Sequence, residues 1–199
     1  MAYSEFTLPE ALRRLGLTRR TAALFSAISP VAPSSVLTAQ LAEGADYALR
    51  QNTEKVRSEL VIMPILMEVR RQLLGQITVF SGKDFVVEPE NGLTGYCDYL
   101  VTGTDDSLLI EAPVLAVVEA KKENIPGGYG QCVAEMEAAR RFNAAAGTPL
   151  PAIYGAVTTG DIWSFLSLQN GVVTLDEEFY YIDRIERILG ILLSVVRSS

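Results

Sequence analysis

The sequence contains no histidine among its 199 residues. This absence excludes Ser-His-Asp and Cys-His catalysis and histidine-ligated zinc, because each of these needs an imidazole. A metal would have to be held by oxygen ligands, which favours Mg²⁺, Mn²⁺ or Ca²⁺. Cysteine is also scarce, since only Cys97 and Cys132 are present. Two cysteines are too few for a disulfide scaffold, and we expect both to be free thiols.

The sequence also lacks a long apolar run and an excess of basic residues. No apolar stretch reaches the roughly 20 residues of a membrane span, and the first residues do not have the pattern of a signal peptide. We therefore expect a cytoplasmic protein that does not contact a membrane. There are 17 Lys and Arg against 24 Asp and Glu, a net charge of −7, which argues against a protein that coats nucleic acid through many phosphate contacts.

What the sequence does contain is a hydrophobic fraction of 49%, enough for one sizeable core at this length. Residues 1–28 have a helical and peripheral pattern, and Ser34 or Ser35 is suited to cap a helix that runs to about residue 49. We therefore predict an N-terminal helical extension over residues 1–49, followed by a second domain over residues 50–199.

The second part of the chain alternates between helical and strand patterns. Residues 52–74 have the apolar spacing of a helix, which Pro64 should kink or divide. After a flexible glycine-rich loop at 124–130, Gln131 is expected to open another helix, and Asp183 to cap the last one. Strands are predicted at 77–80, 85–87, 95–103, 114–121, 152–158, 162–168 and 172–175. This order predicts an α/β fold with a central mixed sheet flanked by helices.

The most informative stretch is residues 114–121, in which five apolar residues lead directly to Glu119, Ala120 and Lys121. Because side chains alternate between the two faces of a strand, Glu119 and Lys121 should point the same way. Opposite charges at the end of an apolar strand are costly to desolvate unless they pair or hold an ion. This stretch is therefore expected to form the edge of an active site.

Asp98 lies within another predicted strand, where aspartate is uncommon and a buried carboxylate needs a partner. Antiparallel neighbouring strands would bring Asp98 beside Glu119. Two carboxylates in one pocket repel each other unless a cation lies between them. With histidine absent, we expect this cation to be Mg²⁺.

Asp98, followed after twenty residues by Glu119-Ala120-Lys121, resembles the D…ExK core of the PD-(D/E)XK, or restriction-endonuclease-like, nuclease superfamily. Glu59 on the upstream helix and Gln131 fit the extended E…D…ExK…Q form of that core. Alone, Glu59 is typical of a glutamate on a helix surface. The resemblance extends over about residues 52–168 and implies a restriction-endonuclease-like fold.

The resemblance implies a divalent-metal-dependent nuclease that hydrolyses phosphodiester bonds of DNA, with a place in a restriction or defence system as one expectation. It implies Mg²⁺, replaceable by Mn²⁺, bound by Asp98, Glu119, the backbone carbonyl of Ala120 and, through water or at a second metal, Glu59.

The resemblance also gives roles to the remaining site residues. Lys121 would orient or deprotonate the attacking water and stabilise negative charge. Gln131 would position Lys121 or that water. Glu135 lies on the same helical face as Gln131 and is an additional candidate, although an ordinary surface residue is the preferred interpretation of Glu135.

A second interpretation is a non-catalytic module that keeps the nuclease fold and binds a protein partner. The net charge of −7 and the lack of an obvious DNA-recognition domain favour it. A homodimer is a further open alternative, because many nucleases of this type cut both strands as dimers. Divalent-cation binding that is lost in Glu119→Ala would favour the nuclease over the non-catalytic module.

Overall fold

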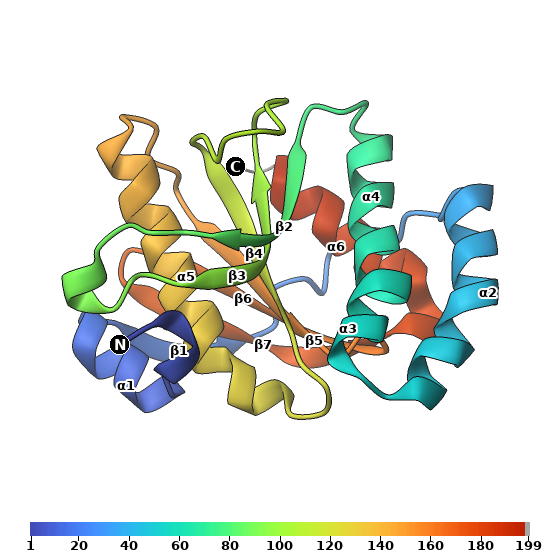
Figure 1. Cartoon of the computed structure of the whole chain (residues 1–199), viewed down its shortest axis with the longest axis horizontal. Helices are drawn as coiled ribbons and strands as arrows, with labels where there is room; N and C mark the ends of the chain where they lie inside the picture. The colour runs from blue at the N-terminus through green and yellow to red at the C-terminus, as the bar shows by residue number, and fades with distance from the viewer. Residues whose placement is uncertain (198–199) are drawn as a thin grey trace.

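The computed structural model describes residues 1–197 and shows one sheet with helices on both faces (Figure 1). Residues 198 and 199, the last two of the domain predicted over residues 50–199, lie outside the described residues. Within the described chain the sheet has seven strands, in the order β1-β7-β6-β5-β4-β3-β2. The strands are β1 (Thr18–Ala22), β2 (Thr78–Asp84), β3 (Tyr96–Thr102), β4 (Val114–Ala120), β5 (Ile153–Thr158), β6 (Ile162–Gln169) and β7 (Val172–Tyr181).

The strand directions make the sheet mixed, as predicted. β1 runs parallel to β7, and β4 runs parallel to β5. The other neighbouring strands are antiparallel. Because β4 and β5 are parallel neighbours, the chain needs a long crossover between them, which the helix α5 supplies.

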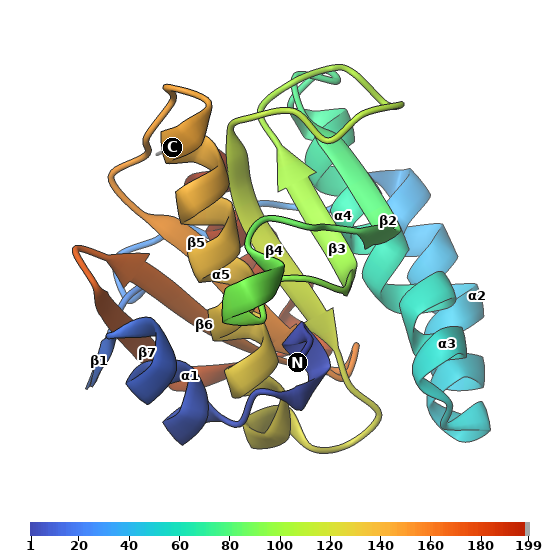
Figure 2. The same cartoon turned by 60° about the vertical axis from the view of Figure 1, so that its left-hand side comes forward.

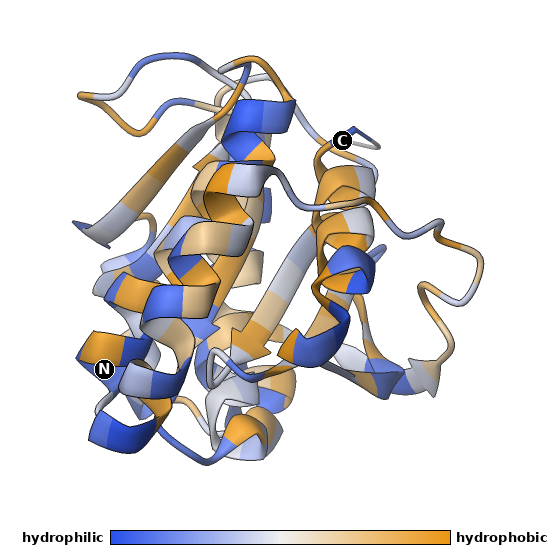
Figure 3. Ribbon diagram, turned by 90° about the vertical axis from the view of Figure 1, so that its right-hand side faces the viewer, coloured by the Kyte–Doolittle hydropathy of each residue, from blue (hydrophilic) through white to orange (hydrophobic). Residues whose placement is uncertain are grey.

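The helices cover the two faces of the sheet in separate groups. One face packs against α2 (Ser35–Gln51), α3 (Glu54–Arg57), the π-helical turn η2 (Ser58–Ile62), α4 (Met63–Gln72) and α6 (Ile185–Arg197). The other face packs against the short η1 (Tyr3–Glu5), α1 (Leu8–Leu15) and α5 (Ile125–Ala145). The short helices η3 (Pro89–Asn91) and η4 (Ile182–Arg184) lie in connections. Figure 3 shows hydrophobic and hydrophilic residues interleaved along the helices, as expected where each helix covers one sheet face.

The expectation of a purely helical extension over residues 1–49 is wrong at β1. Two helices form there as predicted, but Thr18–Ala22 is an edge strand of the sheet. Its residues are almost all exposed, so the stretch has none of the apolar alternation that identifies a strand. Pairing with β7 specifies it instead: the Thr18 N–H donates to the Gly171 carbonyl at 3.0 Å, and Arg20 Nε donates to Thr174 Oγ1 at 3.0 Å.

The flexible loop predicted at residues 124–130 is also wrong, because α5 already begins at Ile125. The side chain of Asn124 accepts a hydrogen bond from the Gly127 N–H at 3.0 Å and caps the helix. Gly130 serves packing: a Cβ there would lie 2.2 Å from the carbonyl oxygen of Phe6. Figure 2 shows the N-terminal segment beside the first turns of α5. The glycines thus permit close helix packing, although their sequence pattern is typical of a loop.

A further difference concerns an element boundary. β2 runs through the turn predicted at residues 81–84, and the strand predicted at 85–87 is absent from the described chain.

The helix predicted over 52–74 is divided, as expected from Pro64, into α3, η2 and α4, and η2 ends just before Met63-Pro64. Proline has no N–H for the residue four positions earlier, which explains the irregular turn at this place.

Candidate active site at the end of strand β4

Glu119 and Lys121 lie on the same face at the carboxyl end of β4, as the strand alternation predicts. Lys121 Nζ forms an ion pair with Glu119 Oε1. The Glu119 side chain is 1% exposed and that of Lys121 is 26% exposed. The carboxylate is therefore buried in the sheet–helix layer, while the ammonium reaches toward solvent.

Gln131 joins this pair from the second turn of α5. Its Nε2 donates to Glu119 Oε2 at 2.9 Å, and its Oε1 accepts from Lys121 Nζ at 3.3 Å. One amide thus contacts both members of the ion pair and fixes their relative orientation. The prediction that Gln131 lies beside Lys121 is confirmed, although the residue does not begin the helix.

Asp98 reaches the same place from β3. The register pairs Tyr99 with Val118, and beyond this pair Asp98 Oδ2 accepts from the Ala120 N–H at 2.8 Å. A carboxylate oxygen therefore takes the position that a backbone carbonyl has in a continuing ladder. Asp98 is held beside Glu119, as the sequence predicts.

The charged side chains of this group shift one another's pKa values. Burial raises the pKa of Glu119 to about 8, repulsion from the neighbouring Asp98 adds to this effect, and Lys121 offsets only part of it. Burial alone would lower the pKa of Lys121, but the carboxylates of Glu119, Asp98 and Glu54 together outweigh burial, so the pKa is raised. Lys121 is consequently a cation at neutral pH.

Glu135, one helical turn after Gln131, is completely buried, so the interpretation of Glu135 as an ordinary surface residue is wrong. Its Oε1 accepts from Gln131 Nε2 at 3.1 Å, but its Oε2 has no hydrogen-bond partner within residues 1–197. Burial, followed by repulsion from Glu119, raises the pKa of Glu135 well above its usual range. A buried carboxyl group with a free oxygen is uncommon in a structural role and is typical of a functional site.

Tyr3 is a neighbour of this group that the sequence does not reveal. It is fully buried, and its hydroxyl finds no hydrogen-bond partner in the described part of the chain. Burial raises its pKa, with contributions from Cys97 and Glu135. Nothing in the local pattern of the first residues indicates this contact, because it arises from the packing of η1 on α5. Cys97 is a buried free thiol, as predicted.

Glu59 lies apart from the buried group. Its side chain is 58% exposed and pairs with Lys55, at 3.3 Å between Nζ and Oε1. It nevertheless lines the same pocket of about 400 Å³ as Asp98. This pocket lies between the α3–η2 segment and strands β2 and β3, and its other lining residues are Glu54, Lys55, Ser58, Met63, Ser81, Gly82 and Tyr99. The structure therefore brings together Asp98, Glu119, Lys121 and Gln131, and places Glu59 across the pocket.

The oxygen donors suit a hard cation in kind. Asp98 and Glu119 are adjacent carboxylates whose repulsion is seen in the raised pKa of Glu119, and a divalent cation would relieve this repulsion. Within residues 1–197, no group of three or more His, Cys, Asp or Glu side chains is arranged to hold a metal ion. A metal at this place would therefore depend on two carboxylates together with backbone or water oxygens.

Comparisons with known proteins do not identify a function for this group of residues. None of the helices within residues 1–197 combines the length and the apolar character needed to cross a membrane. The chain matches no protein-family model, and no curated protein shows significant similarity to it.

Proposed function

We propose that the chain is a divalent-metal-dependent nuclease of the PD-(D/E)XK type that hydrolyses phosphodiester bonds of DNA. The observation that carries this proposal is the joint contact of Lys121 with Glu119 and Gln131 beside Asp98. The four residues come from β3, the end of β4 and α5, and Asp98 also lines the pocket of about 400 Å³. Such a grouping of carboxylates, a cation and an amide is suited to hydrolysis of a charged ester.

Asp98 and Glu119 would hold Mg²⁺ or Mn²⁺, with the carbonyl of Ala120 as a further ligand and Glu59 reached through water. The bound ion supplies positive charge to the phosphate and lowers the pKa of a water molecule. Glu119 must be ionised to serve as a ligand, and its raised pKa means that cation binding releases a proton.

Lys121 would place a fixed positive charge at the scissile phosphate. Because its ion pair with Glu119 raises its pKa, Lys121 is poorly suited to remove a proton from water in the metal-free chain. Its role is to orient the attacking water and to stabilise the negative charge that develops on the phosphate. Gln131 keeps the ammonium in place through its Oε1.

The pocket should depend on a cation to accept DNA. Its lining includes the carboxylates of Glu54, Glu59 and Asp98 but only one lysine, Lys55. Repulsion between these carboxylates and the phosphates opposes binding. We therefore expect DNA to bind weakly in EDTA and more tightly with Ca²⁺, which supports binding without requiring cleavage.

The test is cleavage of single- and double-stranded DNA during titration with Mg²⁺ and Mn²⁺. Asp98→Ala and Lys121→Met should each lower the rate by on the order of 10²-fold or more. Lys122→Met is the matched control, because Lys122 is the adjacent residue, is 54% exposed and pairs with the exposed Glu123 on the surface. Absence of cleavage by the wild type, or full activity of Asp98→Ala, would contradict the proposal.

Calorimetry tests independently whether the chain binds a divalent cation. The wild type should bind Mn²⁺, and Glu119→Ala should not. A wild type that binds neither Mn²⁺ nor Mg²⁺ would favour the second interpretation, a non-catalytic module that binds a protein partner.

A further inference from the structure

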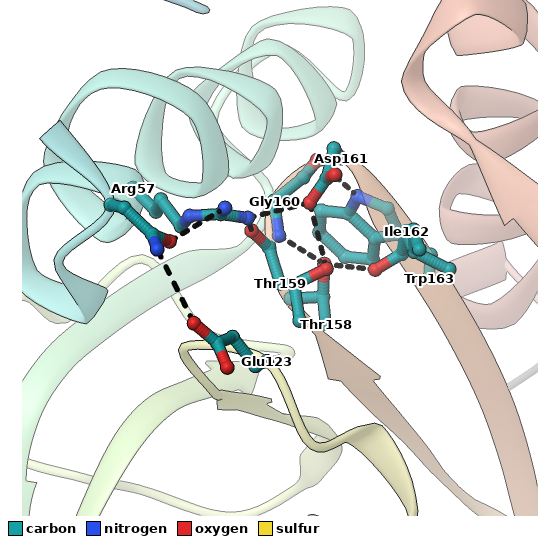
Figure 4. Close-up of polar contacts among 9 residues, drawn as sticks. Arg57, Glu123, Thr158, Thr159, Gly160, Asp161, Ile162 and Trp163 are labelled. Carbon is teal, nitrogen blue, oxygen red and sulfur yellow. Dashed lines mark hydrogen bonds and ion pairs between the residues drawn. The ribbon is translucent and has the colours of Figure 1, made fainter. Parts of the chain in front are cut away.

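Arg57 is part of a second polar cluster, which it forms with the turn between β5 and β6 (Figure 4). Its side chain is 10% exposed. Nη1 donates to the carbonyl of Thr159 and to Asp161 Oδ1, both at 2.7 Å, and Nη2 donates to Asn52 Oδ1 at 3.0 Å. One guanidinium thus joins the end of α2 to the turn between β5 and β6.

The turn that Arg57 contacts also contains hydrogen bonds of its own. Thr158 Oγ1 donates to the Ile162 carbonyl at 2.8 Å and accepts from the Gly160 N–H at 2.9 Å. Trp163 Nε1 donates to the Gly160 carbonyl at 3.1 Å. These hydrogen bonds hold the turn in one conformation. A displacement of Thr159 and Asp161 should therefore also displace the ends of β5 and β6.

The same turn holds the strand end that carries Lys121. The Lys121 N–H donates to the Thr158 carbonyl at 2.8 Å. Two residues later, Glu123 Oε1 accepts from Asn52 Nδ2 at 3.3 Å, so Asn52 bridges Arg57 to the segment after Lys121. The backbone of Lys121 is therefore held directly by the end of β5, and the segment that follows Lys121 contacts Asn52 through the side chain of Glu123.

Arg57 also sets the position of the opposite pocket wall. Ser58 and Glu59, which line the pocket, follow Arg57 directly in the π-helical turn η2. The turn between β5 and β6 packs on η2, because a Cβ on Gly160 would lie 3.5 Å from Val61. Irregular π-helical turns often occur at functional sites.

We infer that Arg57 is a positioning residue, which fixes the pocket wall carrying Glu59 relative to the strand end carrying Lys121. This inference rests on the proposed nuclease function. Stability alone is a weak reason for an arginine here, since a buried ion pair often contributes little net free energy. Three acceptors from two segments require the planar fork of arginine, and lysine cannot reproduce that arrangement.

The kinetic test compares Arg57→Met with Arg57→Lys and with a control. Arg140→Met is the control, because Arg140 also forms an ion pair at 2.7 Å, with Glu137, but on α5 and away from the residues that line this pocket. Arg57→Met should lower kcat by about 10- to 100-fold with KM nearly unchanged, as expected when reacting groups are displaced by about 1 Å. Arg57→Lys should recover part of this loss, and Arg140→Met should keep the wild-type kcat.

The structural test uses the single tryptophan of the chain. Trp163 is buried near the start of β6, and its Nε1 donates to the Gly160 carbonyl in the turn that Arg57 holds. Arg57→Met should therefore shift its fluorescence emission to longer wavelength. Hydrogen exchange of the Lys121 amide should become faster in Arg57→Met and stay unchanged in Arg140→Met. If Arg57→Met does not fold, Asn52→Gly removes the bridge while allowing the left-handed φ of 51° at this residue. It should accelerate the same exchange.

The possible results separate this inference from the proposed function. A wild type without nuclease activity would contradict the function, whereas the fluorescence and exchange would still show whether Arg57 holds the Lys121 strand end. An active wild type with unchanged kcat in Arg57→Met would overturn the positioning role and leave the nuclease proposal intact. Unchanged exchange at Lys121 would overturn it as well.

Discussion

Glu68 and Glu119 are both buried glutamates, with side chains 0% and 1% exposed, but their surroundings differ. Glu68, on α4, accepts hydrogen bonds from the Ser34 N–H at 2.9 Å, from Ser34 Oγ at 2.7 Å and from Gln72 Nε2 at 2.8 Å, and it pairs with Arg71. These donors occupy both oxygens. Glu68 thus joins the start of α2 to α4 as a structural clip.

Glu119 accepts hydrogen bonds from fewer donors than Glu68, and other carboxyl groups lie close to it. Within residues 1–197 its hydrogen-bond donors are Lys121 and Gln131, while Asp98 and Glu135 bring negative charge close to it. Burial opposes ionisation in both glutamates. At Glu68 the bonds from Gln72, Ser34 and Arg71 outweigh burial and lower the pKa, whereas at Glu119 burial and Asp98 raise the pKa to about 8.

The difference teaches how a structural carboxylate can be told from a candidate site. A buried carboxylate with all its acceptor positions filled stabilises the fold and needs nothing more. A buried carboxylate beside other carboxylates is held in a state that a cation or a proton must neutralise. Burial alone does not distinguish them, because both side chains are equally inaccessible.

The largest effect that would test this comparison is loss of stability on removal of Glu68. Glu68→Ala leaves the Ser34 N–H and Arg71 without their acceptor and should lower the free energy of unfolding by about 3 kcal/mol. Urea denaturation measures this change. Nuclease activity per folded molecule should stay at the wild-type level, and a specific loss of kcat would show that Glu68 is part of the site.

The two glutamates should give opposite pH dependences to the stability of the metal-free chain. Between an ordinary pKa of 4.5 and the value of about 8, folded Glu119 keeps a proton that the unfolded chain releases. The free energy of unfolding should therefore fall as the pH rises through this range, by at most about 1.4 kcal/mol per pH unit. Glu68, with a lowered pKa, stabilises above pH 4.5 and loses this contribution as the pH falls further.

Urea denaturation in EDTA across pH 4 to 9 separates the two contributions. Glu119→Gln should weaken the decline between about pH 5 and 8, to which Glu135 also contributes, and Glu68→Gln should weaken the decline on the acid side. If Glu119→Gln keeps the wild-type slope above pH 5, the raised pKa of Glu119 is wrong and the contrast with Glu68 fails.

The sequence predicts the Glu119 group better than it predicts the Glu68 group. Strand alternation places Glu119 and Lys121 on one face, and the strand order brings Asp98 beside them, so the geometry follows from local rules. The contact of Glu68 with Ser34 joins residues 34 positions apart on helices whose packing no local rule specifies. The free oxygen of Glu135 is unpredictable for the same reason.

Other features escaped sequence reasoning because tertiary contacts override the local pattern. The strand β1 has exposed threonines and arginines in place of apolar alternation, and β7 alone specifies it. The first turns of α5 contain three glycines, which usually indicate a loop, but Gly130 is required by the close approach of Phe6. The sheet and its flanking helices remain predictable because their apolar periods are strong.

Glu59 differs from both Glu68 and Glu119, and its substitution should have the smallest effect of those predicted. It lines the pocket with Asp98, yet it is 58% exposed and already paired with Lys55, so it is neither a saturated clip nor a buried acid. An exposed ion pair contributes little free energy to folding. A carboxylate that contacts a metal ion through water also binds it more weakly than a direct ligand does. Glu59→Gln should therefore lower kcat/KM only about threefold, less than about 0.7 kcal/mol, mainly by raising the Mg²⁺ concentration needed for half-maximal rate. Lys55→Met, which frees Glu59 without removing it, should lower that Mg²⁺ concentration. A loss of a hundredfold in Glu59→Gln would instead show that Glu59 binds the metal directly during turnover, which requires that its contact with Lys55 breaks when the cation enters.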